Sequence, residues 1–226
     1  MPDAVIFDLD GVLLDSESIW NDAKRELVEA QGGRWSPGAA RTMMGMSSPE
    51  WARYLRDELG VDMSLDAISD AVVQRLGELY RQRLPLLPGA TKAVRALAAR
   101  WPLGLASSSN RPIIDLVLSA SGLADAFAVT VSSEEVPRGK PAPDVFLEAA
   151  RRMGVAADRC VAIEDSSNGL RSAAAAGMTV IALPNEDYPP SDDALALAAV
   201  KLASLDQLRP DLVEGLEGRA PADGDG

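Results

Sequence analysis

The chain has 226 residues, a net charge of −12, 47% hydrophobic residues and one cysteine, Cys160. These values fit one folded domain, or a core with a smaller insert. The negative charge argues against a nucleic-acid partner, and a lone cysteine excludes an intrachain disulfide. No apolar run suits a membrane helix or a signal peptide, so we expect a cytoplasmic monomer that is not bound to membranes. The absence of histidine excludes Ser-His-Asp and Cys-His catalysis and histidine-bound metals.

Short apolar runs typical of buried strands alternate with amphipathic segments typical of helices. The expected strands are 5–7, 103–106, 128–131, 160–163 and 179–183, and the expected helices between them are 89–100, 111–121, 143–153 and 167–176. This alternation predicts an α/β fold with a doubly wound, mostly parallel sheet and helices on both of its faces. Burial on both faces also explains why the strands are continuously apolar.

The interval 16–84 lies between the first two strands and contains no convincing strand. Helices are expected there at about 16–31, 36–44, 48–59 and 64–83, beginning at Ser16, Ser36, Ser48 and Ser64. The interval is too long for a simple crossover, and we predict that it is a small inserted helical-bundle cap domain. The core would then comprise 1–15 and 85–210, and 211–226 would be a flexible acidic tail.

Two carboxylates, Asp8 and Asp10, follow the first strand directly, with Gly11 next to them. Residues two apart on an extended chain point to the same side, and open α/β sheets bind ligands at the carboxyl ends of their strands. Acids this close repel each other unless a divalent cation lies between them or one of them holds a proton. One carboxylate is then available to attack a substrate, while the other gives and takes a proton. The alternative is a solvated Asp-Gly turn.

A run of serines, Ser107 and Ser108 among them, follows the second strand and leads to Asn110. A hydroxyl and backbone N–H groups at such a turn suit a phosphate group, although an ordinary helix N-cap cluster is the alternative. Lys140 follows the third strand in a chain with four lysines and eighteen arginines. A compact ammonium there would neutralise a phosphate or a carboxylate, whereas the alternative is an exposed loop lysine.

Glu164 and Asp165 follow the fourth strand. Carboxylate oxygens are ligands that suit Mg²⁺, and a helix N-cap would account for Asp165 but not for both acids. Four strand ends thus supply a nucleophile, a metal site, a phosphate cradle and a neutralising cation, which are the parts needed for phosphoryl transfer. We predict a magnesium-dependent enzyme that acts on a small phosphorylated metabolite.

In these four motifs, spread over about 4–208, the chain resembles the haloacid dehalogenase superfamily. The branch it resembles most holds β-phosphoglucomutase-like proteins and sugar-phosphate phosphatases with a small helical cap. The resemblance implies a Rossmann-like core, with Asp8 as the nucleophile that forms an aspartyl-phosphate and Asp10 as general acid and then base. It also implies that Ser107, Lys140 and the backbone N–H of Ser108 hold the phosphoryl group.

The resemblance further implies a magnesium site and a particular backbone geometry. The ion would be bound by Asp8, the backbone carbonyl of Asp10, and Asp165, with Glu164 either binding the ion or lying just behind its ligands. The Lys140–Pro141 bond is expected to be cis.

Two departures from the phosphoglucomutases favour a phosphatase. Those proteins have a histidine where this chain has Trp20, and a cap arginine where the segment 44–48 has serine. We therefore predict hydrolysis of small phosphate monoesters, such as sugar phosphates. A β-phosphoglucomutase-like phosphomutase is the alternative, and a catalytically inactive binding protein is a third possibility.

Aromatic and methionine side chains of the cap are candidates for the substrate pocket: Trp20, Trp35, Met43, Met44, Met46, Trp51 and Tyr54. Trp20 and Met46 are the preferred candidates among them, whereas Trp51 and Tyr54 are expected to form the core of the cap itself. Ser16 and Asn110 are two further pocket candidates. An apolar pocket would favour a leaving group less polar than a hexose.

Overall fold

The computed structural model describes residues 1–43, 46–185 and 188–216. Within these residues six strands form one parallel sheet in the order β3-β2-β1-β4-β5-β6. The strands are β1 Ala4–Phe7, β2 Leu103–Ser107, β3 Phe127–Ser132, β4 Cys160–Glu164, β5 Thr179–Ala182 and β6 Val200–Lys201. The predicted α/β fold is confirmed, but β6 was missed because its two residues form no apolar run.

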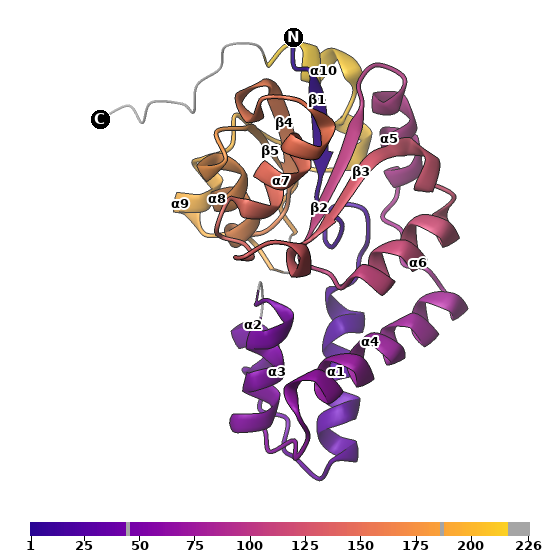
Figure 1. The fold of residues 1–226 in the computed structure, drawn as a ribbon, viewed down its shortest axis with the longest axis vertical. Coiled ribbons are helices and arrows are strands. Elements are labelled where there is room, and N and C mark those ends of the chain that lie inside the picture. The colour runs from indigo at the N-terminus through magenta and orange to yellow at the C-terminus, as the bar shows by residue number, and fades with distance from the viewer. Residues whose placement is uncertain (44–45, 186–187, 217–226) are drawn as a thin grey trace.

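Helices cover both faces of the sheet, as predicted (Figure 1). Val5 and Phe7 of β1 belong to the apolar core that includes α5 (Ala90–Ala98) and α6 (Arg111–Ser121), whereas Ala4 and Ile6 belong to the core that includes α7 (Asp144–Met153) and α8 (Ser167–Ala175). Alternate residues of one strand therefore bury opposite faces. Short helices complete this part: η1 Ala124–Ala126, η2 Ser133–Glu135, η3 Ala157–Arg159, α9 Asp192–Leu195, η4 Leu205–Gln207 and α10 Pro210–Glu214.

Four helices, named here the cap helices, lie beyond the carboxyl ends of the strands (Figure 1). They are α1 Glu17–Ala30, α2 Ala39–Met43, α3 Ser48–Asp57 and α4 Leu65–Gln82. The chain enters and leaves them through neighbouring segments, because the N–H of Asp15 donates to Pro85 O at 2.8 Å and the N–H of Leu87 donates to Leu13 O at 2.9 Å. The apolar faces of these helices pack together around buried residues such as Leu55.

Capping explains where these helices begin. Ser64 accepts a hydrogen bond from the N–H of Ala67 and starts α4 as predicted, and α3 begins at Ser48 with Ser47 and Glu50 forming a capping box. The predicted start at Ser36 was wrong, because α2 begins only at Ala39.

The predicted tail boundary at 211 was set too early. Residues 210–214 form α10, in which Val213 is fully buried, and Leu216 is 4% exposed. Apolar side chains at these positions pack on the core and hold the backbone in place. The rest of the predicted tail, residues 217–226, lies outside the described residues, as does Met44. Across the described ranges, no helix has both the length and the apolar character needed to cross a bilayer.

Candidate active site

The register of the sheet brings the predicted acids to one edge. Phe7 of β1 pairs with Leu105 of β2 and with Ile163 of β4, so Asp8 emerges between these two strands, next to Glu164. The N–H of Asp8 donates to Ile163 O at 3.0 Å, which extends the ladder by one residue. Parallel strands in register therefore place their following residues side by side at the carboxyl edge.

Lys140 bridges the two carboxylates at this edge. Its Nζ donates to Asp8 Oδ1 at 2.6 Å, to Glu164 Oε1 at 2.6 Å and to the backbone oxygen of Ala106 at 3.0 Å. It also lies 4.9 Å from the ring centroid of Phe146. Burial opposes the charged form of Lys140, but the two carboxylates outweigh that effect and raise its pKa. The lysine is therefore a fixed positive charge and not an exposed loop residue, and the Lys140–Pro141 bond is cis as expected.

Glu164 is completely buried, and both of its carboxylate oxygens accept hydrogen bonds from the protein. Oε1 accepts from Lys140, while Oε2 accepts from the N–H groups of Asp165 and Ser166 at 2.9 and 3.1 Å and from Ser166 Oγ at 3.2 Å. A Cβ at Gly169 would lie 1.8 Å from this carboxyl group. The glycine at the start of α8 therefore leaves the space that Glu164 fills.

Asp8, Glu164 and Asp165 form a possible metal site, since each offers an oxygen and these oxygens lie within 4.8 Å of one another. Burial, followed by the charges of neighbouring acids, raises the pKa of Asp165 well above its usual value. Burial likewise raises the pKa of Asp8 to about 7, and Glu164 and Asp10 add to the rise while Lys140 opposes it. One lysine does not balance this concentration of acids, so a divalent cation fits the donor set chemically.

Asp10 also lines the cavity and is held by three donors. Its Oδ1 accepts from Ser16 Oγ at 2.6 Å and from Trp20 Nε1 at 3.1 Å, and its Oδ2 accepts from Ser109 Oγ at 2.5 Å. Ser16 and Trp20 come from the start of the cap helices, whereas Ser109 comes from the loop after β2. Asp10 therefore joins the cap to the core at the site itself.

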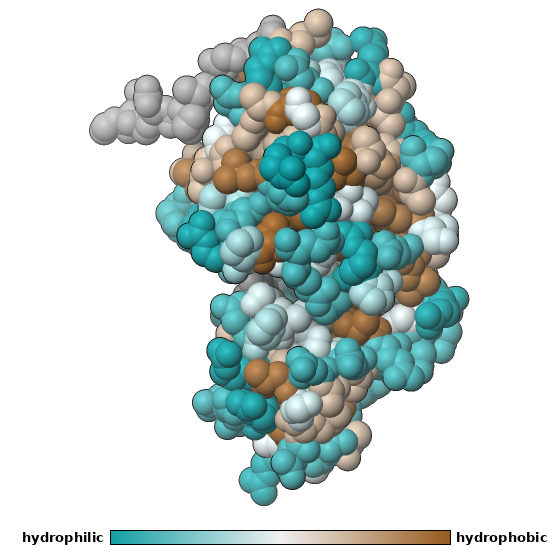
Figure 2. Space-filling model, viewed as in Figure 1, coloured by the Kyte–Doolittle hydropathy of each residue, from teal (hydrophilic) through white to brown (hydrophobic). Residues whose placement is uncertain are grey.

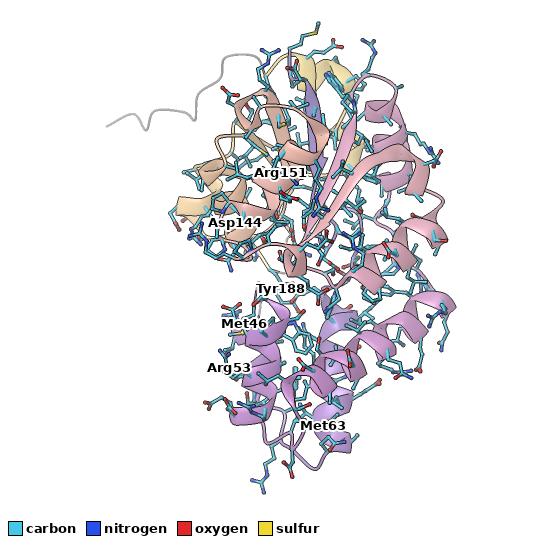
Figure 3. The ribbon with its side chains drawn as sticks, in the orientation of Figure 1. Met46, Arg53, Met63, Asp144, Arg151 and Tyr188 are labelled. Atoms are coloured by element: carbon cyan, nitrogen blue, oxygen red, sulfur yellow. The ribbon has the colours of Figure 1, made fainter. Side chains whose placement is uncertain are left out.

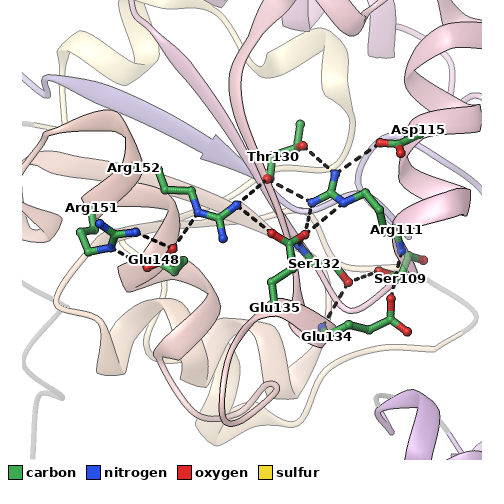
Figure 4. Close-up of polar contacts among 10 residues, drawn as sticks. All are labelled: Ser109, Arg111, Asp115, Thr130, Ser132, Glu134, Glu135, Glu148, Arg151 and Arg152. Atoms are coloured by element: carbon green, nitrogen blue, oxygen red, sulfur yellow. Dashed lines mark hydrogen bonds and ion pairs between the residues drawn. The ribbon is translucent and has the colours of Figure 1, made fainter.

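The serines of the loop after β2 lie in different surroundings. Ser107 Oγ accepts a hydrogen bond from the N–H of Ser109 at 3.0 Å, and Ser107 is fully buried away from the cavity. Ser108 and Ser109 line the cavity in its place. Ser132 Oγ donates to Ser109 O at 2.7 Å, which ties this loop to the polar network of Figure 4. The predicted contact of the Ser107 hydroxyl with phosphate remains a prediction.

A cavity of about 350 Å³ lies between the strand ends and the cap helices. The surface is indented where these two parts meet (Figure 2), and Met46 and Tyr188 are on opposite sides of that boundary (Figure 3). The core lines the cavity with residues that include Asp8, Asp10, Lys140 and Asp165; the cap side adds Ser16, Glu17, Trp20, Lys24, Arg41, Met43, Met46 and Trp51. This volume suits a small metabolite.

The structure supports some of the predicted pocket residues and corrects others. Ser16, Trp20 and Met46 line the cavity. Trp51 is buried in the core of the cap helices, as expected, and it lines the cavity as well. Asn110 does not line it. Its side chain instead accepts from Ser48 Oγ at 3.1 Å and donates to Glu134 at 2.6 Å.

Sequence reasoning missed Ser109 and Lys24. Ser109 belongs to a serine run that had been singled out, so its neighbours were a usable signal. Lys24 lies four and seven residues after Trp20 and Glu17, on the same face of α1, and this spacing is the signal that was overlooked.

Comparison with known proteins identifies the family. The model of the haloacid dehalogenase-like hydrolases matches residues 2–177. Hexitol phosphatase B of Escherichia coli (strain K12) is 35% identical over 211 residues, which cover 91% of this chain and 93% of that protein. Protein CbbY of Rhodobacter capsulatus is 36% identical over 201 residues, covering 84% and 88% of the two chains.

A solved structure agrees with this assignment. The crystal structure of CbbY from Rhodobacter sphaeroides in complex with phosphate has a TM-score of 0.82 and 29% identity, and the match covers 92% of this chain and 96% of that one. The order of the strands, the acids at their carboxyl ends and these similarities lead to one conclusion. The chain belongs to the family of haloacid dehalogenase-like hydrolases.

Proposed function

We propose that this hydrolase is a magnesium-dependent phosphatase of small phosphate monoesters, with Asp8 as its nucleophile. The observation that carries the proposal is a buried carboxylate, Asp8, that is paired with Lys140 and lines a cavity of about 350 Å³ together with Asp10. The similarity to a hexitol phosphatase supports sugar phosphates or related metabolites as substrates. We further propose that residues 16–84 act as a cap domain that closes this cavity over the core.

Asp8 and Asp165 would hold the magnesium ion, together with the backbone carbonyl of Asp10. Glu164 would lie behind these ligands, because Lys140 and two backbone N–H groups already engage its oxygens. When bound, Mg²⁺ supplies positive charge that offsets the phosphate and keeps the neighbouring carboxylates ionised.

Asp8 would attack phosphorus and form an aspartyl-phosphate while the ester oxygen leaves with a proton from Asp10. Water would then attack the aspartyl-phosphate, with Asp10 taking a proton from that water, and Asp8 and inorganic phosphate would be released. Lys140 stabilises the ionised form of Asp8 before the attack and neutralises phosphoryl charge during it.

The partners of Asp10 are suited to this change of role. Ser16 and Ser109 bind it through hydroxyl groups, which donate to a carboxylate and can rotate to accept from a carboxylic acid. Trp20 donates through a fixed N–H and sets the direction of one carboxyl oxygen. These two hydroxyl groups can therefore serve Asp10 in both of its proposed roles.

Hydrolysis of p-nitrophenyl phosphate tests the proposal. We expect turnover with Mg²⁺, loss of turnover with EDTA, and a fall of at least about a thousandfold in kcat for Asp8→Asn, as is usual when a catalytic nucleophile is removed. Asp62→Asn, which changes an exposed aspartate of the cap segment, should behave as the wild type does. Full activity of Asp8→Asn would remove the basis of the proposal.

A hexose phosphate assay separates a phosphatase from a phosphomutase. We expect inorganic phosphate to be released without a bisphosphate primer. Isomerised sugar phosphate that appears only with such a primer would establish the phosphomutase instead.

A further inference from the structure

Lys24 is a buried cation on the cap side of the cavity. It belongs to α1, is 6% exposed, and lines the cavity together with Glu17 and Trp20 of the same helix. Its Nζ lies 5.3 Å from the ring centroid of Trp20 and 5.2 Å from that of Trp51. The two indole rings, themselves 6.3 Å apart, hold the ammonium from two sides.

Within the residues that the structure describes, the Lys24 ammonium has no hydrogen-bond acceptor. Among residues 1–43, 46–185 and 188–216, no hydrogen bond or ion pair of Lys24 is found, whereas Lys140 has three hydrogen-bond acceptors. Within the described residues, the fully buried side-chain nitrogen and oxygen atoms that lack a hydrogen-bond partner are the hydroxyls of Tyr80 and Ser133, and Lys24 Nζ is not among them. Lys24 Nζ therefore keeps access to the cavity, and its N–H groups are available to a ligand.

Lys24 keeps a positive charge although it is buried. Glu17 and Asp10 favour the charged form of Lys24 through space, but burial is the larger effect and lowers its pKa to about 8. The lysine is thus mainly cationic at neutral pH. Arg41, an exposed residue, is a second cation among the cap-side residues that line the cavity. Buried charges of one sign call for a partner of the other sign.

We propose that Lys24 determines substrate specificity by binding an acidic group, a carboxylate or a second phosphate, on the leaving group of the substrate. The inference rests on the proposed phosphatase function and specifies its substrate class. Trp20 fixes the geometry, since its Nε1 contacts Asp10 while its ring contacts Lys24. Lys24 lies four residues, about 6 Å along the helix, beyond Trp20. The acidic group would therefore lie several bonds from the ester oxygen.

Substrate pairs that differ in one acidic group test this proposal. The carboxylate pairs are 3-phosphoglycerate with glycerol 3-phosphate, and 6-phosphogluconate with sorbitol 6-phosphate; the phosphate pair is fructose 1,6-bisphosphate with fructose 6-phosphate. We expect the wild type to prefer the acidic member of at least one pair by about tenfold in kcat/KM, the effect of one charge-assisted hydrogen bond. The pair that shows the preference identifies the acidic group.

Variants of Lys24 show whether this residue causes the preference. Lys24→Met should reduce it to about twofold or less through a higher KM for the acidic member, and Lys24→Arg should restore part of it. Lys92→Met is the matched control, because Lys92 is exposed on α5 and should leave every ratio unchanged.

Three outcomes are decisive. A wild type that prefers neutral members throughout overturns the inference, whatever the variants do. Equal losses on acidic and neutral members, in Lys24→Met and in Lys24→Gln, would make Lys24 a structural residue and also overturn it. A wild type without magnesium-dependent hydrolysis of p-nitrophenyl phosphate would instead contradict the proposed function.

Discussion

Lys140 lets the acids of the site lie close together. Lys140 is 7% exposed. Its ammonium neutralises the charges of Asp8 and Glu164 at the same time and also donates to Ala106 O. A buried charge without such partners would lose its charge or disrupt the packing around it. The same three contacts fix the position of Asp8, so the lysine acts on both the charge and the geometry of the nucleophile.

A burst experiment with Asp10→Asn distinguishes the two proposed roles of Asp10, general acid in the first step and general base in the second. The p-nitrophenolate of p-nitrophenyl phosphate departs without a proton, so the first step should survive, whereas the second step loses its base. We expect rapid release of about one p-nitrophenolate per enzyme and then slow turnover, measured by stopped-flow absorbance. Ser64→Ala, a change in the cap away from the cavity, should give no burst. A uniformly slow reaction without a burst would argue against a base role for Asp10.

Lys24 should also affect how stability depends on pH. Burial lowers its pKa in the folded protein to about 8, below its value in the unfolded chain. Between these two values the unfolded chain binds more protons, so the free energy of unfolding should rise as the pH increases from about 8 towards 10. Urea unfolding of the wild type and of Lys24→Met measures this. The difference between them should shift in favour of the wild type over that range, and a constant difference would contradict the shifted pKa.

The two lysines show what sequence could predict at this scale. Lys140 follows a strand, and strand ends of a parallel sheet meet at one edge, so its neighbourhood with Asp8 was predictable from position. The position of Lys24 in the cavity depends on its contact with Trp51, which belongs to a different helix. The way α1 and α3 pack decides that contact, and no local pattern in the sequence records it.

At the scale of elements, a hydrogen bond between two side chains joins the start of α3 to the start of α6. Ser48 begins α3 and donates to Asn110, the residue that precedes α6, and Asn110 in turn donates to Glu134. The contact joins the start of α3, one of the cap helices, to the start of α6 in the core. It therefore stabilises the observed position of α3 relative to the core.

Ser48→Ala removes that hydrogen bond. A lost hydrogen bond of about 1 kcal/mol should shift the protein towards open arrangements and raise KM roughly fivefold, with a smaller effect on kcat. Steady-state kinetics on p-nitrophenyl phosphate measure this. Ser64→Ala is the control. It removes the N-terminal hydrogen bond of α4, another of the cap helices, and should lower thermal stability without raising KM. An unchanged KM in Ser48→Ala would mean that the contact does not hold the cap closed.

Elements with strong local signals were the predictable ones. The apolar runs of β1, β2 and β4 became strands that are buried at every residue, whereas β3, at the edge of the sheet, is partly exposed. Helix α4 began at Ser64 because the serine side chain caps it. By contrast, β6 gains its two residues only by pairing with β5, and α2 begins three residues after Ser36. Those boundaries depend on tertiary contacts that compete with local propensity.

At the scale of the whole molecule, the acid cluster and the net charge both bear on the response to magnesium. The chain carries a net charge of −12, so any divalent cation will screen it to some extent. A specific site must therefore be separated from general screening. The cluster of Asp8, Glu164 and Asp165 provides the means, because it concentrates acids in a small buried volume.

Thermal unfolding of the wild type, Asp165→Asn and Asp158→Asn distinguishes binding at a specific magnesium site from general screening of charge. Magnesium that binds only the folded state should stabilise the wild type by about 2.7 kcal/mol at a hundredfold excess over Kd. In EDTA at pH 8, Asp165→Asn should melt at or above the wild type, since the pKa of Asp165 is raised by burial and by its acidic neighbours and its charge opposes folding. With magnesium the order should reverse, because that variant lacks a ligand. Asp158→Asn, which removes an exposed acid, should follow the wild type in both conditions. Equal stabilisation of all three proteins would instead indicate screening of the net charge without a specific site.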